Sequence, residues 1–335
     1  MRKLILAAAS AAALALAGPA SAQSPIIIKF SHVVASNTPK GAAAEKFKEL
    51  AEKYTDGKVK VEIYPNSTLY KDKEELEALQ LGAVQMLAPS NSKFGPIGVK
   101  EFEVFDLPYI LPDLVTLRKV TDGPLGAKLL KLLEPKGMTG LAYWDNGAHV
   151  YTANKPLIMP DDFQGMKMRI QGSKVLDAVA RQLGAIPQII AFGELYQALQ
   201  TGVVDGEDNV PSNVYTQKFY DVQKYLTVSH HGRLTYSLIT NTKFWDSLPA
   251  DVRPGLDRAV AESTTFFDDT AAHDNVAALD QIKATGKMEF HVLTDDEKKA
   301  WIAKLMPVHQ EMQGRFGKDF IERIYKASGF TPPQA

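Results

Sequence analysis

The fold class is decided near the N-terminus by residues 58–64, which read Lys58-Val59-Lys60-Val61-Glu62-Ile63-Tyr64. Charged residues alternate here with apolar ones, and this period of two predicts a strand with one buried face. The segment before it is predicted to be a helix, because Thr38 suits an N-cap, Pro39 suits the first helical position and Gly57 ends the pattern. An apolar run at 26–31 predicts a strand before that helix. Strand, helix and strand in this order predict an α/β fold.

The alternation of strands and helices returns in residues 139–240, which predicts a second α/β unit, and the length of the chain allows two domains. Farther on, a helical segment from Leu248 to Thr285 would exceed roughly 50 Å at about 1.5 Å per residue, longer than one small domain needs. We therefore expect two lobes around a hinged cleft, more than one crossing of the chain between them, and this long helix spanning both lobes. The alternative is two helices broken near Pro254 or at Asp268-Asp269. The expected bounds are 23–148 with about 236–265 for lobe I, and 149–235 with about 266–335 for lobe II.

The N-terminus predicts export from the cytoplasm. Arg2 and Lys3 precede an uncharged run of Ala and Leu at 4–17, and Ala20-Ser21-Ala22 follows as an A-x-A cleavage site. The run is too short to cross a membrane as a helix. We expect a signal peptide at 1–22, cleavage after Ala22 and a periplasmic mature chain; the alternative is an uncleaved anchor.

Composition excludes several classes of protein. Hydrophobic residues make up 45% and charged residues 23% of the chain, which is typical of a globular protein. A formal net charge of −1 gives no electrostatic footprint for nucleic acid or an anionic membrane. The chain has no cysteine, which rules out disulfides, thiolate metal sites and thiol catalysis. We expect no nucleic-acid partner, no stable membrane insertion and a monomer.

One arginine lies within an apolar, strand-like run, Gly165-Met166-Lys167-Met168-Arg169-Ile170. Burial of a guanidinium is costly unless it meets an anion, and its planar fork of donors suits a carboxylate. Residues 203–209 are expected to form a short polar loop that ends in Asn209, whose amide can donate to the same anion. Together these residues predict capture of an organic acid rather than its conversion.

Motifs along nearly the whole mature chain resemble those of the extracytoplasmic solute-binding proteins of TRAP transporters, in the branch that binds four-carbon dicarboxylates. They occur in order at family-like spacing: Phe30-Ser31-His32-Val33-Val34, Thr38-Pro39-Lys40-Gly41, Leu107-Pro108-Tyr109, Trp144-Asp145-Asn146-Gly147, 166–170, 191–206 and 218–225. The resemblance implies a hinged, two-lobed binding protein. It would capture a dicarboxylate such as succinate, fumarate or malate and deliver it to a permease with small and large membrane subunits.

The resemblance also implies roles for particular residues. Arg169 would grip one ligand carboxylate and Asn209 would hydrogen-bond it, while Lys40 would contact the second carboxylate. Ser92 would supply a polar contact and Phe192 an aromatic wall. Plainer roles remain open for four of these residues: Arg169 as a surface strand arginine, Asn209 as a turn asparagine, Lys40 as a solvated helix lysine and Phe192 as a core phenylalanine.

The chain departs from the branch at two places. His149 stands where several members carry a ligand-binding arginine, and it is shorter and only partly charged at neutral pH; a hinge histidine without a ligand role is the alternative. Pro211 replaces a tryptophan that helps to close the pocket. Asn213 is retained and is expected to reach the ligand, as is Tyr236, and Arg233 could supply a compensating cation. A larger acid, or one with a single carboxylate, therefore remains an alternative ligand.

Two other classes of protein are weighed against a transport protein. His32, His149, His230 and His231 could act as bases or metal ligands, with Asp145 and Glu207 as carboxylates. The chain has neither an HExxH zinc motif nor a G-x-S-x-G nucleophile elbow. We therefore expect no enzyme, no cofactor and no metal. A periplasmic ligand sensor would share the pocket and remains an alternative.

Overall fold

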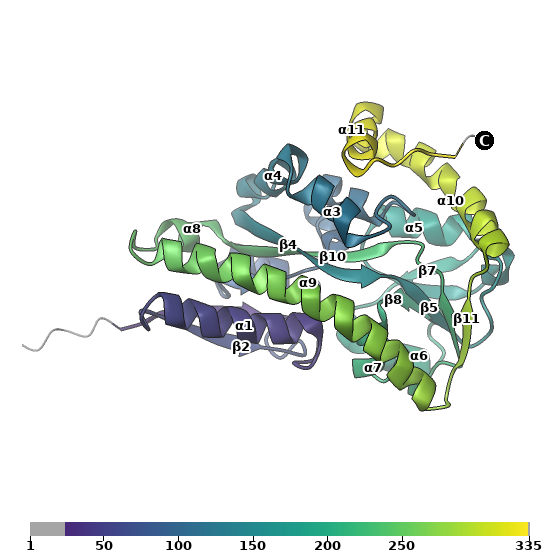
Figure 1. Cartoon of the computed structure of the whole chain (residues 1–335), viewed down its shortest axis with the longest axis horizontal. Coiled ribbons are helices and arrows are strands. Elements are labelled where there is room, and N and C mark those ends of the chain that lie inside the picture. The colour runs from purple at the N-terminus through teal and green to yellow at the C-terminus, as the bar shows by residue number, and fades with distance from the viewer. Residues whose placement is uncertain (1–23, 334–335) are drawn as a thin grey trace, which may run out of the picture.

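The computed structural model describes residues 24–333, and in this part of the chain the main strands form two sheets (Figure 1). The five-stranded sheet has the order β2-β1-β3-β10-β4, with β1 (Ile26–Ser31), β2 (Val59–Tyr64), β3 (Met86–Leu87), β4 (Met138–Ala148) and β10 (Arg233–Asn241). The six-stranded sheet has the order β11-β9-β5-β8-β6-β7, with β5 (Val150–Ala153), β6 (Lys167–Ile170), β7 (Ile186–Ile189), β8 (Gly206–Asn209), β9 (Tyr225–Val228) and β11 (Glu289–Val292). We call the part built on the first sheet lobe I and the part built on the second lobe II. The expected α/β class is confirmed, whereas the predicted signal peptide at 1–22 lies outside the described residues.

Helices pack around both sheets (Figure 1). They are α1 (Pro39–Tyr54), α2 (Glu75–Gln80), α3 (Leu114–Thr121), α4 (Pro124–Lys131), α5 (Lys174–Gln182), α6 (Leu195–Gln200), α7 (Pro211–Thr216), α8 (Thr242–Asp246), α9 (Arg253–Ala284), α10 (Asp295–Phe316) and α11 (Lys318–Ser328). Within 24–333, none of them is both long and apolar enough to span a membrane.

Helix α1 begins where the sequence predicts. The Thr38 hydroxyl accepts a hydrogen bond from the backbone N–H of Gly41 at 3.1 Å, and Pro39 occupies the first turn. The start of the helix lies tightly against the preceding loop, because a Cβ atom added to Gly41 would lie 2.4 Å from the carbonyl oxygen of Ser36. This close approach fixes the first turn, and with it the backbone of Lys40.

Besides α9, the chain passes between the lobes at two neighbouring crossings. The first runs from β4 through His149 into β5, and the second runs from the end of β9 at Val228 to the start of β10 at Arg233. Backbone bonds join the crossings: His149 N–H donates to the carbonyl of Gly232, and His230 N–H donates to the carbonyl of His149, both at 3.0 Å. A paired connection of this kind suits a hinge. The exact residue bounds of the lobes stay a prediction.

Helix α9 is continuous over 32 residues, about 48 Å at the usual rise, although it begins at Arg253 rather than Leu248. Pro254 lies in its first turn, where a missing N–H costs nothing, and Asp268 does not break it. The Asp268 carboxylate instead pairs with Arg118 and accepts from the Asp145 N–H at 3.1 Å. The helix packs on α1 and β4 in lobe I and on α7 in lobe II, so the expected spanning helix is present (Figure 1).

The expected polar loop at 203–209 is wrong for its last four residues, which form the buried strand β8. A polar sequence can be buried here because its side chains bond to their neighbours. The Glu207 carboxylate accepts from the Thr152 hydroxyl at 3.1 Å and from the Asn209 amide at 3.0 Å. Strand β8 therefore carries polar groups into the interior of lobe II.

Candidate functional site

A small pocket lies between the two lobes and is lined mostly by buried side chains. Its space that protein atoms do not fill is about 310 Å³, and this figure includes open solvent. We call it the inner pocket; its lining residues are Val33, Val34, Lys40, Asp72, Ser90, Lys93, Arg169, Gln171, Phe192, Asn209, Asn213, Leu234 and Tyr236.

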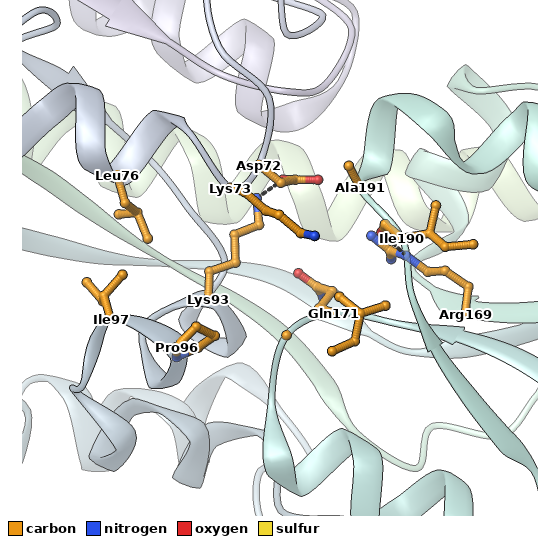
Figure 2. A pocket seen from close by; sticks show the side chains of 12 residues that line it. Asp72, Lys73, Leu76, Lys93, Pro96, Ile97, Arg169, Gln171, Ile190 and Ala191 are labelled. Carbon is orange, nitrogen blue, oxygen red and sulfur yellow. Dashed lines mark hydrogen bonds and ion pairs between the residues drawn. The ribbon is translucent and has the colours of Figure 1, made fainter.

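A wider pocket adjoins it and shares four of these residues: Asp72, Lys93, Arg169 and Gln171. This outer pocket also has apolar walls, which include Leu76, Ile97 and Ile190, and its space of about 980 Å³ includes open solvent. Figure 2 shows Arg169 and Ile190 on one side of it and Asp72, Lys73 and Lys93 on the other. The two pockets together form one cleft with a buried polar end and a partly apolar mouth.

Arg169 comes from the middle of lobe II. It lies on β6 between β7 and β8, with Gln188 and Glu207 as its register partners, and it is 3% exposed. Its Nε donates to the carbonyl of Ile190 at 3.0 Å, which orients the guanidinium. Within residues 24–333, neither terminal nitrogen hydrogen-bonds to another protein group. A nearly buried guanidinium with both ends free is suited to a bidentate carboxylate.

Two amides extend this wall of the pocket. The Asn209 side-chain oxygen accepts from the Asn213 amide at 2.8 Å and from the Val210 N–H at 3.0 Å, while its nitrogen donates to Glu207. These bonds fix the orientation of both amides and use one N–H of each, so one N–H of each is left for a ligand. Burial raises the pKa of the Glu207 carboxyl to about 7, against the opposing effects of Asn209 and the Arg169 charge.

Lys40 comes from the first turn of α1 in lobe I. Its Nζ donates to the carbonyl of Ala88 at 2.9 Å and lies 3.6 Å from the centre of the Tyr236 ring. Burial is the main cause that lowers the pKa of this amine to about 7, and the charge of Lys93 lowers it further. One hydrogen bond leaves the ammonium two further donors, so Lys40 can bind an anion that restores its charge.

Lys93 is already paired within lobe I. It contacts the carboxylates of Asp72 and, at 3.2 Å, Glu75. Burial alone would raise the pKa of Asp72, but the charge and hydrogen bond of Lys93 outweigh it and lower that pKa to about 2. Asp72 also accepts the backbone N–H of Phe192, and this hydrogen bond joins lobe I to lobe II.

The structure brings together six of the nine residues that the sequence nominated. Those that line the inner pocket are Arg169, Asn209, Asn213, Lys40, Phe192 and Tyr236. Phe192 is a wall rather than only a core residue, and its ring centre lies 6.0 Å from the guanidinium carbon of Arg169.

The other three residues have different partners. Ser92 donates to Asp106 at 2.8 Å, and its neighbour Ser90 lines the pocket instead. Arg233 makes two bonds of 2.6 Å to the carboxylate of Asp145, so its charge is already matched. His149 lies against Asp208, at 2.9 Å, and does not line either pocket that contains Arg169 and Lys93.

Sequence reasoning missed Asp72, Ser90, Lys93 and Gln171. Ser90 and Lys93 lie on either side of Ser92, the residue chosen from the sequence, and they line the inner pocket whereas Ser92 does not. Gln171 follows directly after the apolar run that contains Arg169, and this position was the available signal. Asp72 lies in a Lys- and Glu-rich stretch that is typical of a solvated surface.

Comparison with known proteins identifies the group to which this architecture is similar. The model of the family described as "Bacterial extracellular solute-binding protein, family 7" matches residues 30–315. The C4-dicarboxylate-binding periplasmic protein DctP of Rhodobacter capsulatus is 61% identical over 323 residues, which cover 96% of this chain and 97% of that protein.

Solved structures agree in fold and differ in ligand. A TRAP periplasmic solute-binding protein from Shewanella oneidensis with bound succinate has a TM-score of 0.88 and 41% identity, over 91% of this chain and 100% of that one. The sugar-acid-binding protein DctPAm from Advenella mimigardefordensis, in complex with galactonate, also has a TM-score of 0.88, with 32% identity over 91% and 98% of the two chains.

Proposed function

Because this chain belongs to family 7 of the bacterial extracellular solute-binding proteins, we propose that its inner pocket captures a four-carbon dicarboxylate such as succinate, fumarate or malate. The observation that carries the proposal is the state of Arg169: a side chain 3% exposed, held through Nε, with both terminal nitrogens free of protein partners within residues 24–333. Leaving such a group without an anion is costly. One ligand carboxylate therefore binds Arg169, with the remaining N–H groups of Asn209 and Asn213 beside it.

The charges of the inner pocket favour a ligand with two carboxylates. Three cations line it, Lys40, Lys93 and Arg169; Asp72 compensates Lys93, and burial raises the pKa of the neighbouring Glu75 carboxyl, which favours its neutral form. Lys40 and Arg169 remain, one from each lobe, and a dianion matches them. The second carboxylate is assigned to Lys40, with the Ser90 hydroxyl near it. A ligand held from both lobes gains its full binding energy only when the cleft is closed.

A second candidate is a larger acid with one carboxylate, and the outer pocket favours it. Because the two pockets share Asp72, Lys93, Arg169 and Gln171, an acid gripped by Arg169 could extend into the wider space. The galactonate complex of a protein 32% identical to this chain is consistent with a related pocket taking a sugar acid. Pro211 stands in place of a large aromatic residue, and the loss of that side chain also favours a larger acid.

The proposal assigns capture and release, without chemical conversion of the acid. The mature chain would act in the periplasm, after removal of residues 1–22, and would deliver its ligand to a TRAP permease with small and large membrane subunits. Family membership and the 61% identical periplasmic relative support this part of the proposal.

A thermal-shift screen of residues 23–335 tests the ligand class. The panel holds four- to six-carbon dicarboxylates, hydroxy acids, 2-oxo acids, sugar acids and aromatic acids. At about 1,000 times its dissociation constant, a true ligand stabilises the folded chain by roughly 4 kcal/mol. The largest shift is expected with a four-carbon dicarboxylate. A shift confined to sugar acids or other monocarboxylates would replace the first candidate with the second, and no shift with any acid would overturn both.

A further inference from the structure

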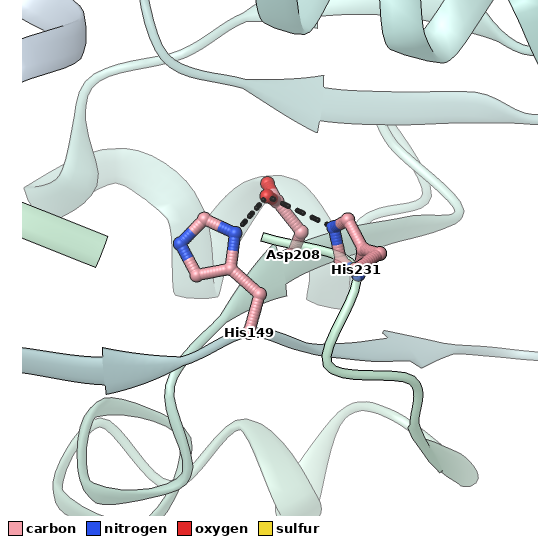
Figure 3. Close-up of side chains that lie close together, drawn as sticks. All are labelled: His149, Asp208 and His231. Carbon is pink, nitrogen blue, oxygen red and sulfur yellow. Dashed lines mark ion pairs between the residues drawn. The ribbon is translucent and has the colours of Figure 1, made fainter. Parts of the chain in front are cut away.

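Three potential metal ligands meet at the hinge, outside the inner and outer pockets. His149 lies in the first crossing between the lobes, His231 lies in the second, and Asp208 lies on β8. Figure 3 shows both imidazole rings directed at the Asp208 carboxylate from opposite sides. The residues are far apart in sequence, so the crossing of the chain brings them together.

The spacing of these groups fits a single metal ion. Nδ1 of His149 lies 2.9 Å, and Nε2 of His231 3.8 Å, from the same Asp208 oxygen, and one ligand atom of each residue lies within 4.8 Å of the others. Ligands about 2.1 Å from a Zn²⁺ ion are about 2.9 Å apart at a right angle and about 3.8 Å apart at about 130°. Small side-chain shifts would therefore give three protein ligands around one ion.

The imidazole nitrogens of this cluster lack the hydrogen bonds that burial demands. His149 and His231 are each 3% exposed, yet both ring nitrogens of His149 and Nε2 of His231 have no hydrogen-bond partner in residues 24–333. His149 Nδ1 is close to Asp208, but the ring N–H direction does not point at the carboxylate oxygen well enough for a bond. Buried polar atoms of this kind need an explanation, and a bound ion is one.

Neighbouring groups hold His231 ready to bind. Its Nδ1 is hydrogen-bonded to the Ser229 hydroxyl at 2.8 Å, which leaves Nε2 facing Asp208, and its ring stacks on Tyr151 at 4.2 Å between centres. A second partner on the far ring nitrogen is the usual way in which a protein orients a metal-binding histidine.

We propose that His149, Asp208 and His231 form a binding site for a divalent transition-metal ion of the Zn²⁺ class. Two imidazoles and one carboxylate form a set of ligands that proteins use for such ions. The sequence analysis named His149 and His231 among possible metal ligands, without Asp208, and expected no metal because the chain has no recognisable metal motif.

An ion at this position would tie both hinge crossings to β8. Asp208 is followed directly by Asn209, whose amide lines the inner pocket. Occupancy of the hinge site would therefore stabilise one arrangement of the lobes and alter acid affinity through the reciprocal coupling of two sites. The site itself does not depend on which acid the pocket takes.

Calorimetric titration with Zn²⁺ tests the proposal on residues 23–335, stripped of metal and in the absence of any organic acid. We expect one ion per chain, and at least about 10- to 100-fold weaker binding after His231→Gln. The matched control is His273→Gln, since His273 is exposed and pairs with Asp274 at 3.0 Å, outside the proposed site; the Zn²⁺ affinity of this variant should equal that of the wild type. Because the site is buried, a second sample is refolded in the presence of Zn²⁺.

The unmodified chain supplies a readout that does not depend on any variant. Loaded with Co²⁺, it should develop visible absorption bands typical of nitrogen and oxygen ligands in a low-symmetry site, and added Zn²⁺ should remove them. Equal Zn²⁺ affinity of the wild type and His231→Gln would overturn the proposal. Absence of binding in both the native and the refolded samples would also overturn it.

Discussion

The lobe I and lobe II walls of the inner pocket differ in how far protein groups already compensate their positive charges. On the lobe II wall, Arg169 has one bond to a backbone carbonyl and two free ends. On the lobe I wall, Lys93 has two carboxylate partners, and Lys40 has a carbonyl and an aromatic ring. Lobe II thus presents a guanidinium already oriented for an anion, whereas lobe I compensates most of its own charge before any ligand arrives.

This difference in charge compensation predicts separate roles for the two lobes in binding the acid. A guanidinium built into the middle strands of a sheet is rigid and always charged, so it can hold a carboxylate in the open protein. An amine whose pKa burial lowers to about 7 gains most when an anion comes close, which happens when the cleft closes. We infer that lobe II binds first and that lobe I supplies selectivity for a second carboxylate.

The largest effect is expected from Arg169→Ala, which removes the free guanidinium of lobe II. Loss of one partner of a buried ion pair costs about 3–5 kcal/mol, so the Kd for succinate should rise by more than about 100-fold. Arg181→Ala is the matched control, because Arg181 belongs to the same lobe but is exposed and pairs with Asp177 at 2.8 Å. Calorimetric titration measures both; near-normal affinity of Arg169→Ala would refute the assigned role of this wall.

Arg169→Lys separates charge from geometry, because lysine keeps the positive charge but lacks the planar fork of the guanidinium. A compact ammonium cannot make two parallel bonds to one carboxylate, and it cannot keep the Nε bond to Ile190. We expect at least about tenfold weaker succinate binding than in the wild type. Recovery of full affinity would mean that charge alone, rather than bidentate geometry, explains the lobe II wall.

Lys40→Met tests the lobe I wall with a side chain of similar length. Loss of a charged hydrogen bond costs about 1.5–3 kcal/mol, so succinate should bind roughly 10- to 100-fold more weakly, while a monocarboxylate should be little affected. Lys46→Met is the control on the same helix, because Lys46 pairs with Glu49 outside the pocket. Equal losses for both ligand types would show that Lys40 supports the fold rather than the second carboxylate.

The smallest expected effect is the dependence of acid affinity on pH, which distinguishes the contribution of Lys40 in lobe I from that of Glu207 in lobe II. Lys40 and Glu207 both have a pKa of about 7 in the free protein. A bound dianion raises both pKa values, so binding takes up protons, and affinity should fall as pH rises above 7, by at most about tenfold per unit for each proton. Titration at pH 8 in buffers of different ionisation enthalpy counts these protons. The Lys40→Met variant should take up fewer protons on binding. Unchanged proton uptake would assign the pH dependence to Glu207.

Much of the fold could be predicted because it rests on local patterns. Thr38 and Pro39 predict the start of α1, and the long segment of helical periodicity predicts α9. The membership of the family, inferred from motifs such as 191–206, is confirmed. Strand β8 could not be predicted in the same way, because Glu207 and Asn209 are polar and become buried only through bonds to each other and to Thr152.

The candidate site shows the same limit of prediction from local sequence patterns. Arg169 was found because a charge inside an apolar run is conspicuous. Arg233 was nominated on its charge, but its partner Asp145 lies 88 residues away and no local signal reveals the pair. Asp72 was missed because its position in the lining of the pocket depends on Lys93 and on a hydrogen bond from the other lobe. The roles assigned to the pocket residues stay predictions until ligand binding is measured.

The most direct test of a two-walled pocket compares succinate with succinamate, in which one carboxylate becomes a neutral amide of nearly the same shape. Calorimetric titration of residues 23–335 and of Lys40→Met with both ligands forms a thermodynamic cycle. The two-walled account predicts that the wild type prefers succinate by at least about tenfold and that this preference largely disappears in Lys40→Met. Equal affinity of the wild type for both ligands would contradict the claim that each lobe holds one carboxylate.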